Sequence, residues 1–294
     1  MSRKSLLSAA FALSMLLACS GIATAQDAAV NEIQQLTGPI IHLGTHTYTP
    51  GGLHIQVNPE DFGNIPEIGG GTVVYDNTTG TGFFSNRPPG QEIVDSADLP
   101  DGTNVGEFQI GFVSDAVGSV TMRYTFYQTN LFDSITGILQ GHNGSDAQFV
   151  ITVSGLPGGG LFGFTVNIVL EPEDHFVITG PDVDAFAGTD WGWSYASLDI
   201  GTGTALGPLI TTPGGGPGAP GSEDLFDRYD PPLADGGTYT NTFNFGGFPV
   251  AAFHMQLIEG VAPFFTIPTL SEYGLGLMVL LLMGAAVVMM RRSV

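Results

Sequence analysis

The side chains with the most direct chemical potential are aspartates gathered in two stretches of the chain. They are Asp182, Asp184 and Asp190 in the first stretch and Asp224, Asp227 and Asp230 in the second. Calcium takes six to eight oxygen ligands from carboxylates and loop carbonyls, so each stretch is a candidate for an irregular Ca²⁺ site. The stretch from Asp182 starts like an EF-hand loop, but Phe186 occupies the third ligand position, which excludes that motif. The alternative is that both stretches are solvated acidic loops.

A second candidate is the serine in Gly192-Trp193-Ser194-Tyr195-Ala196, which falls one residue short of the G-x-S-x-G nucleophile elbow. That elbow needs a strand, a sharp turn and then a helix, which lift the serine above a parallel sheet. Residues 197–203 contain two glycines and no helical pattern, so the elbow is not expected to form. With no other constellation of nucleophile, base and orienting group, the sequence predicts a protein that is not an enzyme.

Two tryptophans, Trp191 and Trp193, lie two residues apart and therefore share one face of an extended strand. Exposed together, they would form a platform on which sugar rings stack, as in a carbohydrate-binding module. Buried together, they would be part of the core of a β-sandwich. The sequence leaves both alternatives open.

Three histidines lie in neighbouring predicted strands, His42 and His46 in residues 40–48 and His54 in residues 53–57. A hairpin turn at residues 50–52 would place His46 diagonally opposite His54 on one face. Two histidines do not complete a zinc site, so hydrogen-bonded or exposed strand histidines are expected here.

The elements that must position these residues are predicted to be strands. Short apolar segments alternate along the chain with Gly, Pro, Asn and Asp, a pattern typical of an all-β protein. About eleven such segments predict one large antiparallel two-sheet sandwich, jelly-roll-like, over residues 26–262. Residues 147–154 and 162–170 flank a glycine-rich turn and predict a second hairpin. Residues 201–222, rich in Gly and Pro, predict a long surface loop.

The charge and the cysteine content of the chain limit which partners and which stabilising bonds residues 26–262 can have. Of seven basic residues, only Arg87, Arg123 and Arg228 lie between the end segments, whereas the chain holds 28 acidic residues. Such an acidic surface repels nucleic acid and anionic lipid, so no nucleic-acid partner is expected. Cys19 is the only cysteine, so the body must be stabilised by its core, without a disulfide.

The N-terminus has the layout of a secretory signal peptide over residues 1–25. A basic start is followed by an apolar run and by small residues that include Ala23 and Ala25, which predicts cleavage after Ala25. The segment ending at Cys19 resembles a bacterial lipobox. Lipidation at Cys19 is therefore the alternative processing route.

The C-terminus combines a polar motif, an apolar segment and a basic end over residues 263–294. Residues 274–290 are apolar and of a length at the short end of the roughly 17–25 residues that cross a bilayer as a helix. Arg291 and Arg292 follow, as positive charge does on the cytoplasmic side. The sequence therefore predicts one C-terminal transmembrane helix with the bulk of the chain outside.

The polar motif before that segment carries a family resemblance. It reads Ile267, Pro268, Thr269, Leu270, Ser271, Glu272, Tyr273 and Gly274. With the segments that follow, it resembles the IPTL-CTERM sorting signal of Gram-negative bacteria, a relative of the PEP-CTERM signals. The usual pattern has Trp where this chain has Tyr273. The resemblance implies recognition by an exosortase-type membrane protease, a cut near the motif, and transfer to the cell surface or extracellular matrix.

These observations predict an exported, surface-sorted, non-enzymatic protein with a structural, adhesive or matrix role. A surface carbohydrate-binding module, with an exopolysaccharide or another glycan as partner, is the alternative, and a secreted hydrolase is the third hypothesis. Permanent anchoring by the C-terminal helix is the alternative to its removal. No cofactor is expected other than Ca²⁺ at the acidic loops.

Overall fold

The structure is a computed structural model that describes residues 33–58, 71–127, 132–133, 138–139, 147–179, 189–211, 225–232, 235–244 and 252–260. The chain divides into two compact units, Met1–Val261 and Ala262–Val294, and every described residue belongs to the first. The described residues form strands and contain no α-helix, which confirms the all-β prediction. The predicted helix 274–290 lies outside them, as do both processing sites at the N-terminus.

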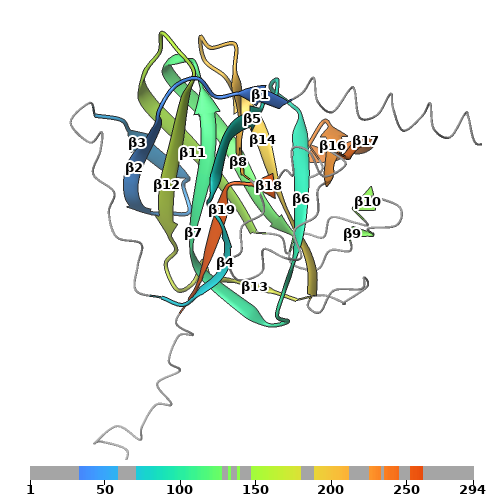
Figure 1. Cartoon of the computed structure of the whole chain (residues 1–294). Helices are drawn as coiled ribbons and strands as arrows, with labels where there is room; N and C mark the ends of the chain where they lie inside the picture. Colours follow the sequence, from blue (N-terminus) through green and yellow to red (C-terminus); the bar gives the residue numbers. More distant parts are fainter. Residues whose placement is uncertain are drawn as a thin grey trace, which may run out of the picture. The chain divides into compact units, whose positions relative to one another are not determined.

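Ten strands form the larger sheet, whose main order is β1-β5-β15-β7-β12-β2, with β19 also paired to β7 and β4, β13 to β7 and β18 to β15. Their bounds are β1 Ile33–Gln35, β2 Ile40–Thr47, β4 Val73–Asn77, β5 Gly80–Ser85, β7 Thr103–Ser114, β12 Phe162–Val169, β13 Phe176–Ile178, β15 Leu206–Thr211, β18 Ala252–Phe253 and β19 Met255–Glu259. Figure 1 shows β12, β7 and β19 running across one face of this unit.

Seven strands form the second sheet in the order β17-β16-β6-β14-β8-β11-β3, and a separate pair joins β9 to β10. The bounds are β3 Leu53–Gln56, β6 Glu92–Leu99, β8 Val117–Tyr127, β9 Phe132–Asp133, β10 Ile138–Leu139, β11 Ala147–Pro157, β14 Thr189–Asp199, β16 Leu225–Asp230 and β17 Thr238–Asn244. All pairings in this sheet are antiparallel except that of β3 with β11.

The two large sheets share one hydrophobic core that is rich in aromatic rings. Phe126 of β8 is fully buried, and its ring lies 5.1 Å from that of Phe108 on β7 in the opposite sheet. The same ring stacks on Phe176, at 4.7 Å, and on Trp191, at 6.2 Å. Because such side chains each bury a large apolar area, this aromatic layer is the main source of stability in a body without a disulfide.

Both predicted hairpins are wrong, although their turns exist. β2 belongs to the ten-stranded sheet and β3 to the other, and β11 and β12 are divided in the same way. The turns at residues 48–52 and 158–161 therefore cross between sheets. Because both connections cross between sheets, β2 lies beside β12 in the larger sheet and β3 lies beside β11 in the other. Each of these two pairs is parallel. All other strand pairs of the two large sheets are antiparallel, as predicted for the sandwich.

The predicted loop 201–222 is also wrong over part of its length. Residues 206–211 form β15, whose side chains are all buried, while residues 212–222 lie outside the described residues. Leu206 to Pro208 pair with β7, and Leu209 onward pair with β5. Pro208 cannot donate a ladder hydrogen bond, so its place in a central strand is unusual. It sits where the strand exchanges one partner for the other.

We predict that Phe126→Ala lowers the free energy of unfolding by about 3–5 kcal/mol. The truncation would leave a cavity among aromatic rings that cannot all collapse into it. Urea unfolding followed by tryptophan fluorescence measures the effect. The matched control is Val117→Ala on the same strand, where the side chain is 60% exposed and a change within about 0.5 kcal/mol is expected. Equal losses for the two variants would contradict this account of the core.

Candidate functional site

The outer face of the ten-stranded sheet carries rows of polar side chains. On β7, Phe108, Ile110 and Phe112 join the core, so the residues between them, Gln109 and Gly111, face away from it. The neighbouring strands continue this alternation, so that polar residues come into register on the outer face. Those on β7, β12 and β19 are nevertheless buried, which distinguishes this part of the face from an ordinary solvated surface.

Two rows make up this surface, which we call the polar face. The first, the amide row, crosses five strands from β2 to β4 and consists of Thr45, Asn167, Gln109, Gln256 and Asp76. The second, the histidine row, consists of His42, Thr165, Gly111 and His254. His254 lies between β18 and β19, where its backbone N–H donates to Leu209 and its carbonyl accepts from Gly111.

A directed chain of hydrogen bonds joins the two rows. Gln109 Oε1 accepts from His254 Nε2 at 2.9 Å, because an amide oxygen cannot donate. Gln109 Nε2 in turn donates to Asn167 Oδ1 at 2.6 Å. Nε2 of His254 therefore carries a proton, and in the neutral imidazole its Nδ1 is an acceptor.

Several buried polar atoms of this face have no hydrogen-bond partner among the residues that the structure describes. They are His42 Nε2, Asn167 Nδ2, His254 Nδ1 and Gln256 Oε1. His42 is otherwise held by Thr165, with 2.9 Å between Nδ1 and Oγ1. Buried polar atoms are normally paired, and leaving one unpaired costs about 1–3 kcal/mol. Four such atoms lie on one face of one sheet, which makes it the candidate site within the described residues.

The electrostatics of the histidine row keep it uncharged. Burial lowers the pKa of His254 to about 4, an effect that the nearby Asp76 opposes and His42 reinforces. Burial, with a smaller contribution from His46, also lowers the pKa of His42. The ring of His254 occupies the space above Gly111, where an added Cβ would lie 2.9 Å from the Cβ of His254. The glycine is therefore required by the close approach of this ring.

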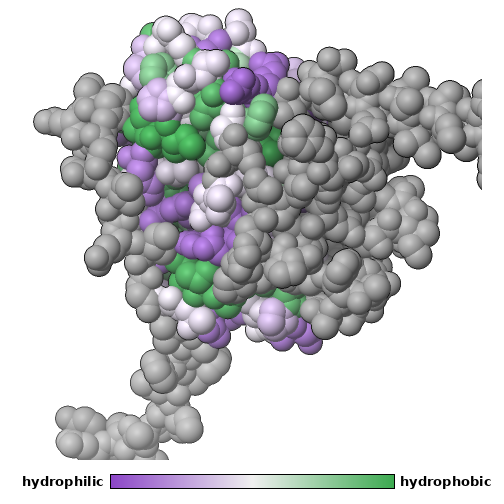
Figure 2. Space-filling model, in the orientation of Figure 1, coloured by the Kyte–Doolittle hydropathy of each residue, from purple (hydrophilic) through white to green (hydrophobic). Residues whose placement is uncertain are grey.

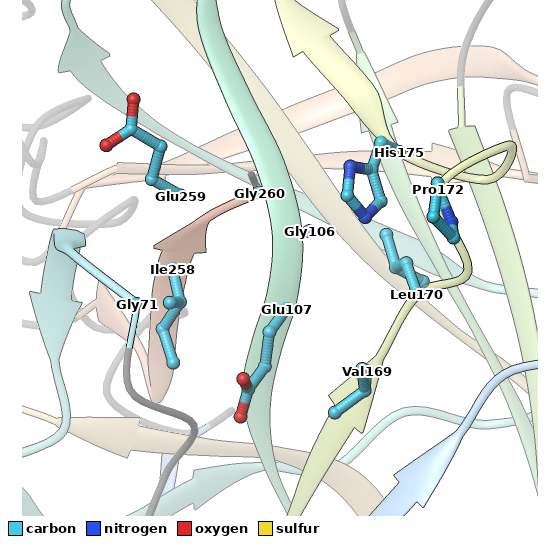
Figure 3. A pocket seen from close by; sticks show the side chains of 10 residues that line it. All are labelled: Gly71, Gly106, Glu107, Val169, Leu170, Pro172, His175, Ile258, Glu259 and Gly260. Atoms are coloured by element: carbon cyan, nitrogen blue, oxygen red, sulfur yellow. The ribbon is translucent and has the colours of Figure 1, made fainter. Parts of the chain in front are cut away.

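The polar face is bounded by different surroundings at its two ends. At one end lies a small apolar cluster of Leu36, Phe84, Val113, Ala205 and Leu209. At the other end is a hollow of about 270 Å³. Figure 3 shows Glu107 between Ile258 and Val169 there, with His175 farther along. Figure 2 shows a hydrophilic band across the visible part of this surface, with hydrophobic patches above and below it.

The tryptophan platform predicted as one alternative is not available. Trp191 and Trp193 are both fully buried on β14, with their rings stacked 4.5 Å apart. Trp193 also packs against Tyr75 of the opposite sheet, at 5.4 Å. They form sandwich core, because β14 lies in the middle of its sheet and turns this face toward the other sheet. A glycan-stacking role for these two rings is therefore wrong.

Three of the six predicted calcium ligands lie among the residues that the structure describes. Asp182, Asp184 and Asp224 lie outside the described residues. Asp190 and Asp227 lie on β14 and β16, and Asp230 is an exposed residue at the end of β16. Among the residues that the structure describes, no three His, Cys, Asp or Glu side chains are grouped to hold a metal ion. Calcium binding by the acidic stretches stays a prediction.

The serine of the short elbow motif has a structural role. Ser194 lies within β14 and is fully buried; its hydroxyl donates to Glu92, which also accepts from Tyr127 at 2.7 Å. Ser194 therefore belongs to a buried hydrogen-bonded cluster with Glu92 and Tyr127, and it lies within an extended strand and not at a turn. His46 bonds to the carbonyl of Leu43, and the diagonal pairing with His54 does not form because β2 and β3 lie in different sheets.

Sequence reasoning missed the polar face. A signal was present in the alternation of Glu107 and Gln109 with apolar residues on β7. The partners on β12 and β19 lie far away in the chain, so only the strand pairing brings the rows together.

Comparison with known proteins identifies the C-terminal segment. Residues 266–292 match the IPTL-CTERM motif, which confirms the predicted sorting signal. Such signals indicate export and a membrane-anchored precursor destined for the cell surface. No helix in the described part of the chain is long and apolar enough to span a membrane. Neither a curated protein nor a solved structure matches the chain.

We predict that His254 makes stability depend on pH between about 6.5 and 4. In that range the unfolded state binds a proton that the folded state rejects, so stability is complete above pH 6.5 and falls as the pH drops toward 4. The expected contribution is on the order of 3 kcal/mol. Urea unfolding at a series of pH values should give a shallower slope for His254→Gln than for the parent. His54→Gln, at an exposed histidine, is the control; a parent slope in His254→Gln would refute the assignment.

Proposed function

We propose that this chain is an exported, non-enzymatic surface protein whose β-sheet body has a structural, adhesive or matrix role. The observation that carries this proposal is the match of residues 266–292 to a sorting signal. The body supports it, since two large sheets around one core would make a rigid sandwich of the jelly-roll type for display outside the cell. The high negative charge would keep such a body dispersed.

Processing at both ends follows from the same proposal. An exosortase-type membrane protease would recognise the motif from Ile267 to Gly274 while residues 274–290 hold the precursor in the membrane. Arg291 and Arg292 would stop transfer of the tail. A signal peptidase would cut after Ala25, and lipidation at Cys19 is the competing route. The C-terminal helix is then a temporary retention device.

We propose that the chain is not an enzyme because of the burial and the hydrogen bonding of its candidate catalytic side chains. The serine with the closest approach to a nucleophile motif, Ser194, is fully buried and engaged with Glu92. The histidines of the polar face are neutral: His42 is hydrogen-bonded to the Thr165 hydroxyl and His254 to the Gln109 amide, and within the described residues neither is hydrogen-bonded to a serine or a cysteine. A nucleophile needs both a base within reach and access to substrate.

We predict that mass spectrometry of the protein from its native cells will find the N-terminus after Ala25 and the C-terminus near Thr269. Substitution Pro268→Ala should block recognition, so the uncut precursor accumulates in the membrane fraction. Ser293→Ala, in the tail beyond the motif, is the control and should be processed as the parent is. An intact C-terminus in the mature parent protein would instead establish permanent anchoring.

A further inference from the structure

One end of the two-sheet body is apolar at its surface. Four segments make up this end, which we call the tip: residues 38–40, 115–119, 157–163 and 199–204. Two of the three large apolar side chains that are exposed in the described part of the chain lie here, Ile40 at 46% and Val117 at 60% exposure. The other apolar side chains at the surface of the tip are exposed or half-buried: Pro39, Pro157, Leu161 and Phe162.

The four segments are packed against one another, so these side chains belong to one surface. The hydroxyl of Thr202 donates to the carbonyl of Val117 at 2.9 Å and accepts from its backbone N–H at 3.3 Å. A Cβ added at Gly158 would clash with Val117, and one added at Gly38 would clash with the carbonyl of Leu161. Leu161 itself packs on the small apolar cluster beneath the tip. The exposed apolar groups are therefore held in fixed positions.

The tip carries little free charge. Its ionisable residues are Asp115 and Asp199, and both are hydrogen-bonded within or beside the tip. Asp115 accepts from the N–H and the hydroxyl of Thr204 and from the N–H of Ala205, at 2.6–2.9 Å, and Asp199 accepts from the N–H of Gly201 at 2.8 Å. All other acidic residues lie outside these four segments. Singly exposed apolar residues are ordinary, but a group of them on a surface with so little charge indicates a contact site.

The tip is separate from the hollow at the end of the polar face. β7 ends beside the tip at Ser114, whereas Val105, near its start, pairs with Glu259 of β19, a lining residue of the hollow. At about 3.3 Å per residue, these two positions on β7 are about 30 Å apart. Figure 1 shows the turn from β11 to β12 at the top of the view and β13 near the bottom. Any contact made by the tip is therefore independent of the candidate site.

We propose that the tip binds the tip of a second copy of this chain. The proposal rests on the proposed function, because a structural, adhesive or matrix role requires contacts between molecules. The same patch would serve both partners, so the pair would have two-fold symmetry and would close on itself. Removal of the exposed apolar groups of both tips from water would supply the driving force.

Charge favours this contact over other contacts between two copies. Each chain has a formal net charge of −21, so most pairs of surfaces would bring carboxylates together. When tip meets tip, the groups that approach most closely are apolar, and the carboxylates outside the tips stay farther apart, where salt screens them. A lipid surface is the competing occupant. The tip contains no Lys or Arg, the residues that draw a protein to anionic headgroups.

The contact is expected to be weak and reversible. Few side chains of the tip are exposed, so the interface would be smaller than that of a stable complex. Copies displayed together on a surface would still hold one another, because several weak contacts made at once add up to a strong one.

The test uses the full-length chain in phosphatidylcholine nanodiscs with one chain in each disc. Sedimentation velocity at increasing concentration measures the pairing of loaded discs with each other and with empty discs. We expect reversible pairs of loaded discs and no pairs that include an empty disc. Pairing with empty discs would identify lipid as the occupant and overturn the proposal. Loaded discs that stay single up to the solubility limit would overturn it as well.

A matched pair of valine variants tests whether the tip makes the contact. Val117→Asp places a carboxylate in the apolar patch and should raise the dissociation constant at least about tenfold, because burying an unpaired charge is costly. The control is Val177→Asp, which adds the same charge at a valine of 39% exposure on β13, at the other end of β7. It should pair as the parent does. Both variants should keep the parent melting temperature, and equal weakening of pairing in the two would refute the role of the tip.

A mixing experiment tests whether each tip contacts the other tip. Fluorescently labelled Val117→Asp is mixed with the unlabelled parent, and formation of mixed pairs is followed by sedimentation. Mixed pairs should be weak, because one of the two apolar surfaces is damaged. Mixed pairs of parent affinity would show that a tip binds a different surface of its partner, which contradicts the two-fold contact. Because purified protein is used, a failure of surface sorting in cells would leave all these results unaffected.

Discussion

The burial of an aromatic layer between two sheets is the constraint on which the rest of this structure depends. The chain has one cysteine, Cys19, and it lies in the predicted signal peptide, so no disulfide is available to the body. Phe126 lies at the centre of the layer and contacts rings from both sheets. Trp191 and Trp193 are required there, which removes them from any surface role. Function must therefore come from the outer faces and the chain ends.

The sequence predicted the elements more successfully than their partners. The alternation of apolar residues is clearest in β7 and β8, because each is long and has one face in the core. The glycine-rich segments marked real turns, but a turn does not state whether the next strand stays in the same sheet. β15 was not predicted because Gly207 and Pro208 interrupt the apolar pattern of this short buried strand. Strand pairing between distant segments is the information that local pattern lacks.

The same limit explains the candidate site. Gln109, Asn167 and His254 are separated by long stretches of sequence, and none stands in a recognisable motif. Their chemistry emerges when β12, β7 and β19 are placed side by side. The sorting signal is the opposite case: its residues are contiguous, so residues 266–292 could be identified from sequence alone. Motifs read by other proteins are local, whereas surfaces made by folding are not.

The position of β19 has a mechanical consequence. This strand ends at Glu259, shortly before the sorting motif, and it is paired antiparallel with β4 on one side and β7 on the other. A force applied along β19 would therefore shear both ladders of hydrogen bonds at once. A strand at the edge of a sheet, pulled across its ladder, would lose its bonds one after another. β19 is thus held to the rest of the body by two ladders of hydrogen bonds.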